Sequence, residues 1–474
     1  MPARVQTIAA ESAALHEALA SLRLELDLPH EFPREALDRA AQSAADPDIP
    51  SSDETDIRFV TIDPEGAQDL DQALHLERDG GGYTVRYAIA DVSAFVTAGD
   101  AVDDEARRRG QTLYAADGRI PLHPESISER AGSLLPGQIR PALVWELGLD
   151  ARGELRRTTL RRSLIRSREQ LSYAEAQRRI DDGSADASLA LLRTIGELRI
   201  ALEAERGGAS LDMPEEQIVD FEDGFRIERR TLLPAEQWNA QISLLTGMAA
   251  ADLMLEAGQG VLRTMPKPDA AALQKFRAEA AALGFEWPTG LAYGEFLRGI
   301  DRSTPEAMAL LQSARRLFRG ADYTIISPGL SREEASQAAI GAPYAHTTAP
   351  LRRLVDRYVL AHCLAIAKDR PIPGWAAEGL AELPEIMRSS SQRAGALERA
   401  SVDLVEIAVL HGREGDQFEA VVIEQRADDA RIQLVDPPTE ALCDTGASAG
   451  TIITVRLKEA DLASRTLRFT GPAS

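Results

Sequence analysis

Three aspartates, Asp63, Asp69 and Asp71, stand within nine positions of the sequence, and Gln72 follows them directly. The cluster begins where the apolar run 57–62 ends, so a strand would deliver it to a turn. Carboxylates this close together repel one another, and a hard divalent cation such as Mg²⁺ removes that cost. This chemistry suits metal-assisted hydrolysis of a phosphodiester. Spacing alone favours a solvated acidic turn instead, because aspartate-rich turns are common.

Two other kinds of metal site do not fit the sequence. An EF-hand loop needs oxygen ligands and a glycine at set positions, and neither Asp63 nor Asp69 begins such a loop. Zinc is disfavoured because the seven histidines are scattered and form no HExxH or paired Cys/His motif.

A second group of residues lies in the C-terminal half of the chain, where a helix is predicted to begin. Thr348 is placed to cap this helix and Pro350 to occupy its first turn. Arg352 and Arg353 then fall at the helix start, where two guanidinium groups would bind a phosphate. The alternative is an ordinary ion pair between Arg352 and Asp356, one helical turn away. The sequence by itself favours neither.

Composition narrows the class of protein. The 474 residues are 44% hydrophobic and carry a net charge of −22, which is typical of a soluble globular protein without a broad basic surface. The apolar runs are too short to span a bilayer and no signal-peptide core is present, so we expect no membrane association. Two cysteines, Cys363 and Cys443, are too few for a disulfide framework and predict a reducing, cytoplasmic location.

The elements that must position these residues divide the chain into three parts. Residues 1–50 contain two short helical segments, and residues 51–410 mix strands with helices. Strands dominate before about residue 170 and helices after it, which favours an α+β fold over a doubly wound sheet. Residues 411–474 hold four or five short strand runs between turns, which suits a five-stranded β-barrel of the OB type.

Four blocks of the middle part, taken in order, resemble the catalytic RNB domain of the ribonuclease II and ribonuclease R exoribonucleases. They are TIDPEGAQDLDQAL from 61, YAIADVSAFV from 87, QTLYAADGRIPLHPESISERAGSLLPGQIRPAL from 111 and YAHTTAPLRRLVDRYVLAH from 344. One block matches easily by chance, whereas four in order are a strong signal. The last part is similar to the S1-type OB module that binds RNA.

The resemblance implies a Mg²⁺-dependent 3′→5′ exoribonuclease, with Mn²⁺ able to substitute, that hydrolyses single-stranded RNA to nucleoside 5′-monophosphates. It implies that Asp63, Asp69 and Asp71 build the Mg²⁺ site at the end of a narrow channel. Gln72 stands where the family pattern has a fourth, metal-binding aspartate. A glutamine oxygen can coordinate a hard cation but carries no charge, so we expect weaker Mg²⁺ binding. The alternative is a catalytically impaired RNA-binding protein on the same scaffold.

The resemblance also implies roles for residues that contact the RNA. Tyr114 would stack on a base near the 3′ end, and Arg352 would contact the scissile phosphate with Arg353 beside it. Glu398, in the segment LERAS, would lie close to the terminal nucleotides. The arginines of 156–168 are candidates for the channel lining, with a solvated strand edge as the equal alternative.

The first part of the chain departs from the family pattern. Family members usually begin with two cold-shock domains, and residues 1–50 are too few to hold them. One interpretation makes the two helical segments a helix-turn-helix-like element that docks RNA. No obligate protein partner is expected.

Overall fold

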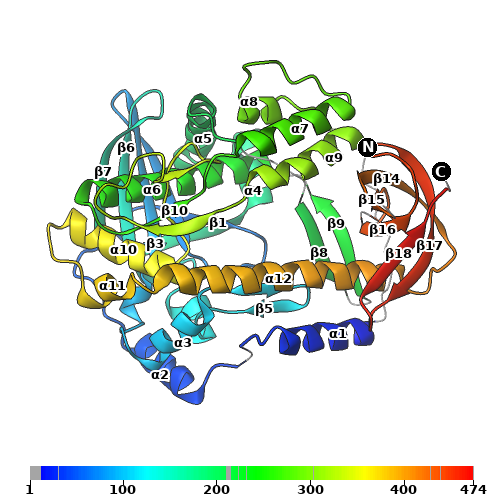
Figure 1. The fold of residues 1–474 in the computed structure, drawn as a ribbon. Coiled ribbons are helices and arrows are strands. Elements are labelled where there is room, and N and C mark those ends of the chain that lie inside the picture. Colours follow the sequence, from blue (N-terminus) through cyan, green and yellow to red (C-terminus); the bar gives the residue numbers. More distant parts are fainter. Residues whose placement is uncertain are drawn as a thin grey trace.

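The computed structural model describes residues 12–29, 31–209, 215–221, 224–230, 232–302, 304–426, 429–437 and 439–472. Two closed β-barrels lie at opposite ends of the molecule, and the long helix α12 (Leu383–Leu410) runs from the larger body toward the C-terminal barrel (Figure 1). The expected α+β architecture with a C-terminal five-stranded barrel is confirmed.

The first barrel carries the acidic cluster. Its strands are β1 (Phe59–Asp63), β2 (Gln72–Asp79), β3 (Gly82–Ala90), β6 (Ile139–Leu149) and β7 (Leu155–Ser172). They pair in that order, and the barrel closes where β1 runs parallel to β7. The two-residue turn Gly80–Gly81 joins β2 to β3, and Gly80 has φ 58°, as the turns favoured in hairpins require.

Helices cover the first barrel and bury its outer apolar side chains. The helices packed on it are α4 (Tyr173–Asp182), α5 (Ala187–Glu205), α6 (Pro234–Ala257) and α10 (Leu354–Ala367). The other helices of the body are α2 (Arg34–Ala45), α3 (Ala101–Arg109), α7 (Ala270–Ala282), α8 (Tyr293–Arg298), α9 (Pro305–Ala314) and α11 (Gly374–Gly379). Short helical turns are η1 (Val92–Ala94), η2 (Ser126–Ala131) and η3 (Arg315–Leu317). Within the described residues, no helix combines the length and apolar character needed to cross a bilayer.

In the part of the chain that the structure describes, four small two-stranded sheets complete the body. They are β4–β5 (Leu113–Ala115, Gly118–Ile120), β8–β9 (Glu215–Phe221, Gly224–Arg230), β10–β11 (Val261–Thr264, Asp322–Ile325) and β12–β13 (Ser336–Gln337, Ala342–Pro343). The second barrel holds β14 (Gln417–Gln425), β15 (Ala430–Leu434), β16 (Glu440–Asp444), β17 (Ile452–Asp461) and β18 (Thr466–Thr470). Its core is separate from that of the first barrel, and the free thiols of Cys363 and Cys443 are buried in the two different cores.

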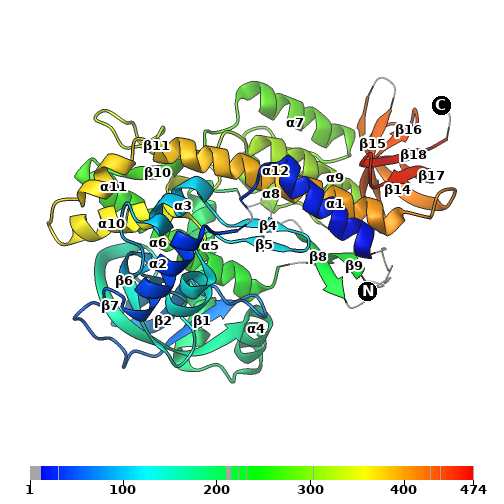
Figure 2. The ribbon, with the colours of Figure 1, turned by 90° about the horizontal axis from the view of Figure 1, so that it is seen from below.

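The N-terminal helices pack against different parts of the body. Helix α1 (Ser12–Glu25) lies along α12, and its leucines share a core with α12 and the β4–β5 hairpin (Figure 2). Helix α2 packs instead on α3. Because the two helices have separate partners, they do not form the packed pair that a helix-turn-helix requires. The chain uses α1 as a support for the hairpin.

Candidate active site

Barrel strands bracket the acidic cluster. Asp63 is the last residue of β1, and Asp71 immediately precedes β2. The buried hydroxyl of Ser133 accepts a hydrogen bond from the Leu70 N–H (2.9 Å) and donates one to the Gln68 carbonyl (2.6 Å). These bonds fix the loop that carries the acids. The solvated-turn alternative is wrong for the two flanking carboxylates, since Asp63 is 8% exposed and Asp71 is fully buried.

The two buried carboxylates differ in their partners. Asp71 Oδ1 accepts from the Leu351 N–H (2.8 Å), and its Oδ2 accepts from Arg352 Nε (2.7 Å). Burial nevertheless raises the pKa of Asp71 to about 6, against the attraction of Arg352. Asp63 Oδ2 is buried without a hydrogen-bond partner. Burial raises the pKa of Asp63 to about 7; Arg352 opposes the rise, whereas the neighbouring charges of Asp71 and Asp69 add to it.

The arginine motif folds differently from the prediction. Helix α10 begins at Leu354, so Pro350 and Arg352 lie in a turn before the helix. The reason lies in the tertiary structure. The Leu354 N–H donates to the carbonyl of Gly110, the C-cap residue of α3 (2.9 Å), and Arg353 is extended at the N-cap of α10 with φ −137°. Arg353, and not Arg352, forms the ion pair with Asp356 (2.9 Å). This turn leaves Arg352 free to reach the acidic cluster.

The β4–β5 hairpin brings an aromatic ring to the same place. Tyr114 and Arg119 are directly opposite each other on its two strands, and so are Leu113 and Ile120. Alternate positions face opposite sides, so Leu113 and Ile120 pack against α1 and α12 while Tyr114 and Arg119 share the other face. Tyr114 is 50% exposed. Burial of its hydroxyl raises the pKa of Tyr114. The charge of Arg352 opposes this rise, and those of Asp69 and Asp71 add to it.

Arg119 is a site residue that the sequence did not reveal. Its Nη1 donates to Asp69 Oδ1 (2.8 Å), and its Nη2 lies 2.7 Å from Glu129 Oε1. Burial alone would lower the pKa of Arg119, but these two acids raise it above its ordinary value. The signal was the short segment YAADGR, in which a two-residue turn places Arg119 opposite Tyr114.

Gln72 does not point freely at the carboxylates. Its Nε2 donates to the Thr348 carbonyl, and its Oε1 accepts from the Tyr87 hydroxyl at 3.4 Å. Tyr87 is itself hydrogen-bonded to Ser243 Oγ (2.8 Å). Asp71 and Gln72 therefore hold two points of the same segment, the Leu351 N–H and the Thr348 carbonyl, just before Arg352. The amide contributes to the site by fixing this segment.

The donor set fits a hard divalent cation. Carboxylate oxygens are the ligands that Mg²⁺ prefers, and one of them, Asp63 Oδ2, is buried without a partner. In the described part of the chain, no group of three or more Asp, Glu, His or Cys side chains is already arranged around one point. Asp69 and Asp71 bind guanidinium groups instead. The cation would satisfy Asp63 and lower the cost of the two buried charges.

Two of the predicted RNA contacts have surroundings other than the carboxylates of the cluster. Arg353 is held by Asp356, and Glu398 is exposed on α12, next to the stretch that packs on the hairpin. The arginines of 156–168 lie along β7. Asp63 pairs with Ser172, at the C-terminal end of that strand. Ion pairs with acidic side chains are formed by Arg156, Arg157, Arg161 and Arg162. Their charges are therefore balanced within the protein, and the channel lining stays a prediction.

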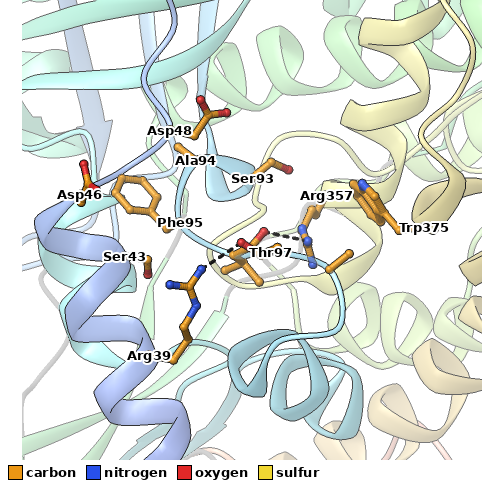
Figure 3. A pocket seen from close by; sticks show the side chains of 12 residues that line it. Arg39, Ser43, Asp46, Asp48, Ser93, Ala94, Phe95, Thr97, Arg357 and Trp375 are labelled. Atoms are coloured by element: carbon orange, nitrogen blue, oxygen red, sulfur yellow. Dashed lines mark hydrogen bonds between the residues drawn. The ribbon is translucent and has the colours of Figure 1, made fainter.

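A pocket of about 380 Å³ lies outside this cluster. It opens between α2 and the segment 93–98, with Arg357 and Trp375 on its other side (Figure 3). Arg357 stacks on the Trp375 ring at 4.5 Å and donates to the Val96 carbonyl (2.9 Å). None of the predicted site residues lines this pocket.

Comparison with known proteins identifies the two parts of the chain. The family model described as the RNB domain matches residues 52–367, and that of the RNase II-type exonuclease C-terminal S1 domain matches 416–471. Exosome complex exonuclease RRP44 homolog A of Arabidopsis thaliana is 30% identical over 413 residues, which are 81% of this chain and 43% of that protein. Ribonuclease R of Escherichia coli (strain K12) is 30% identical over 321 residues, 64% of this chain and 38% of that protein. The chain thus spans about two fifths of the length of these curated relatives.

Solved structures share the fold. Mycoplasma genitalium RNase R in complex with ribose methylated single-stranded RNA superposes with a TM-score of 0.87 at 20% identity, covering 97% of this chain and 78% of that one. Yeast Ssd1, a pseudonuclease, superposes with a TM-score of 0.67 at 17% identity, covering 95% of this chain and 58% of that one. The resemblance drawn from the four sequence blocks is confirmed. The chain belongs to the RNB-domain family and ends in the S1 domain of RNase II-type exonucleases.

Proposed function

We propose that this protein is a hydrolytic 3′→5′ exoribonuclease that uses Mg²⁺ to degrade single-stranded RNA to nucleoside 5′-monophosphates. The observation that carries the proposal is the meeting of Asp63, Asp69 and Asp71 with Arg352 and an exposed Tyr114 at one end of the first barrel. Membership of the RNB family, with relatives named ribonuclease R and exosome complex exonuclease, supports the reaction type.

Each residue has a task that its chemistry allows. Asp63, Asp69 and Asp71 would hold the divalent cation, and Asp63 Oδ2 is the oxygen most ready to bind it. When bound there, the cation would supply a nucleophilic water and would stabilise the leaving oxygen of the phosphodiester. Arg352, held by Asp71, would balance negative charge on the scissile phosphate. Hydrolysis then leaves a 5′-phosphate on the released nucleotide and a 3′-hydroxyl on the shortened RNA.

Two further elements would hold the substrate. The exposed ring of Tyr114 offers a face on which any base can stack, at about 1–3 kcal/mol per base, which suits degradation without sequence preference. The C-terminal barrel, 411–474, would bind RNA outside the catalytic centre, and discrimination against DNA would rest on contacts to the 2′-hydroxyl. A cytoplasmic location agrees with the two buried free thiols.

A second candidate is an RNA-binding protein that does not hydrolyse. Gln72 replaces an acid with a neutral amide, and its side chain is engaged by the Thr348 carbonyl and Tyr87. Guanidinium groups neutralise Asp69 and Asp71, so the metal must compete for both. The similarity to the fold of a pseudonuclease keeps this candidate open.

One assay separates the two candidates. A 5′-labelled single-stranded RNA is incubated with excess protein in millimolar Mg²⁺, with an EDTA-treated sample as the control. The exoribonuclease produces a ladder that shortens from the 3′ end, releases nucleoside 5′-monophosphates and stops when EDTA is added. RNA that stays intact while a gel-shift shows it bound would support the non-hydrolytic protein.

A further inference from the structure

The guanidinium group of Arg119 joins two carboxylates through two different nitrogens. Nη1 binds Asp69 Oδ1 (2.8 Å) and Nη2 binds Glu129 Oε1 (2.7 Å). The Arg119 side chain is 29% exposed, so it lies at the boundary between the acidic cluster and solvent. Because each acid has its own nitrogen, Arg119 can lose one partner and keep the other.

Asp69 is the carboxylate for which two cations compete. A divalent cation held by the cluster would use oxygens of Asp69, one of which now accepts from Arg119. Two cations on one carboxylate repel each other, so metal binding weakens the pair between Arg119 and Asp69. Glu129 retains the guanidinium group on the hairpin when Asp69 turns to the metal. The released Nη1 then faces the site with a free N–H group.

A freed guanidinium group in this position suits a phosphate. Arginine presents a planar fork of N–H donors that matches phosphate oxygens. Tyr114 stands opposite Arg119 on the hairpin, and cross-strand neighbours have Cβ atoms about 5 Å apart. A base stacked on Tyr114 therefore brings its own phosphate within reach of Arg119. Resting on the proposed function, we propose that Arg119 binds an RNA phosphate and that Asp69 masks it until a metal ion binds.

The proposal makes metal and RNA binding reciprocal. The metal frees Arg119 for RNA, and RNA that holds Arg119 leaves Asp69 to the metal, so each ligand strengthens the other by the same factor. The hairpin itself does not need the ion pair to keep its place. Its other face packs through Leu113 and Ile120 against α1 and α12. A structural role alone therefore predicts no change in metal affinity when Arg119 is replaced.

The first test measures metal binding without RNA. Mg²⁺ is titrated calorimetrically into the wild type, Arg119→Gln, Arg119→Lys and Arg130→Gln. Arg119→Gln should bind Mg²⁺ about fivefold more tightly, as expected from losing a partly exposed ion pair that competes with it. Arg119→Lys keeps the charge and should bind Mg²⁺ as the wild type does. Arg130 pairs with Glu125 at the exposed surface and serves as the matched control. Unchanged or weaker Mg²⁺ binding by Arg119→Gln overturns the proposal.

The second test measures RNA affinity with and without the metal. The probe is a fluorescent single-stranded RNA whose 3′-terminal phosphodiesters are phosphorothioates, and gels confirm that it stays intact. In EDTA, Arg119→Gln should bind it as the wild type does, because Arg119 is masked by Asp69. With Mg²⁺, the variant should bind this RNA about fivefold more weakly than the wild type does. An equal loss in EDTA and in Mg²⁺ would show that Arg119 is never masked.

The outcomes keep this inference apart from the proposed function. A wild type that degrades RNA with Mg²⁺, beside an Arg119→Gln variant with unchanged metal and RNA affinities, overturns the role of Arg119 alone. A wild type that neither binds Mg²⁺ nor degrades RNA overturns the proposed function and the inference together.

Discussion

Replacing Asp63 with asparagine should stabilise the metal-free protein while removing its function. Asp63 is 8% exposed, its Oδ2 has no hydrogen-bond partner, and Asp71 and Asp69 add negative charge nearby. A cation would relieve this arrangement, and without one the folded state carries the cost. Asparagine has almost the same shape but no charge, so Asp63→Asn removes the cost without opening a cavity.

The size of the effect follows from the pKa. Raising the pKa of Asp63 from 3.8 to about 7 costs the ionised folded state about 4 kcal/mol. The amide N–H₂ of asparagine would be buried without an acceptor, and this offsets about 1–3 kcal/mol of the stabilisation. The free energy of unfolding should therefore rise by about 1–3 kcal/mol at pH 8 in EDTA.

The pH dependence has a definite sign. The pKa of Asp63 is higher in the folded state than in the unfolded state, so the folded protein keeps a proton that the unfolded chain releases. The stability contributed by this proton is present at low pH and is lost as the pH rises from about 4 through about 7. The difference between Asp63→Asn and the wild type should thus be small near pH 5 and largest above about pH 7.5.

Urea unfolding in EDTA at pH 5.5 and pH 8 tests this reasoning. All four tryptophans precede residue 411, so their fluorescence follows the catalytic part and not the C-terminal barrel. Glu65→Gln, at an exposed position of the same loop, is the matched control and should change little. Added Mg²⁺ should stabilise the wild type and not Asp63→Asn. A variant that is no more stable than the wild type at pH 8, or equally so at both pH values, would refute the account of Asp63 as a strained ligand.

Substitutions of Gln72, Tyr114 and Leu22, with their controls, address the rest of the site. Gln72→Asp should lower the Mg²⁺ concentration that half-saturates RNA hydrolysis, and an unchanged midpoint means that residue 72 is not a ligand. The same substitution loses the hydrogen bond to the Thr348 carbonyl, which should cost about 1–2 kcal/mol of stability without metal. Tyr114→Ala should alter the length of the final RNA product on a gel, whereas Tyr114→Phe should preserve it, and identical products from all three proteins would count against stacking. Leu22→Ala, in the core between α1 and the hairpin, should cost about 2–4 kcal/mol and raise the KM for RNA. Leu24→Ala, on the exposed face of α1, should leave both quantities unchanged.

Local sequence was enough to predict several elements. The run 57–62, expected as a strand, supplies most of β1, because an apolar stretch before a turn has few other stable arrangements. Strand β2 was not among the predicted runs, although Leu74 and Leu76 alternate with His75 and Glu77 as in a half-buried strand. Barrel closure pairs β2 on both edges and makes it a strand regardless.

The acidic cluster was also visible in the sequence, and its burial was not. Whether Asp63 and Asp71 are solvated depends on Ser133 and on the turn before α10, which are far away along the chain. For the same reason, the sequence does not reveal the partners of Arg119 and Arg352. A helix start predicted at Pro350 fails because a hydrogen bond from Leu354 to the end of α3 outweighs the local preference.

The sequence by itself determined the chemistry that the chain can perform: three carboxylates on a turn, an aromatic ring and arginines in an order that marks the RNB family. Those features are local, so the residue types and their spacing specify them. Only the tertiary structure decided how these groups meet. It buried Asp63 without a partner, gave Asp71 to Arg352, and brought Arg119 to Asp69 on a hairpin supported by α1. Pairings of this kind join residues up to 281 positions apart, and no local pattern carries information over that separation.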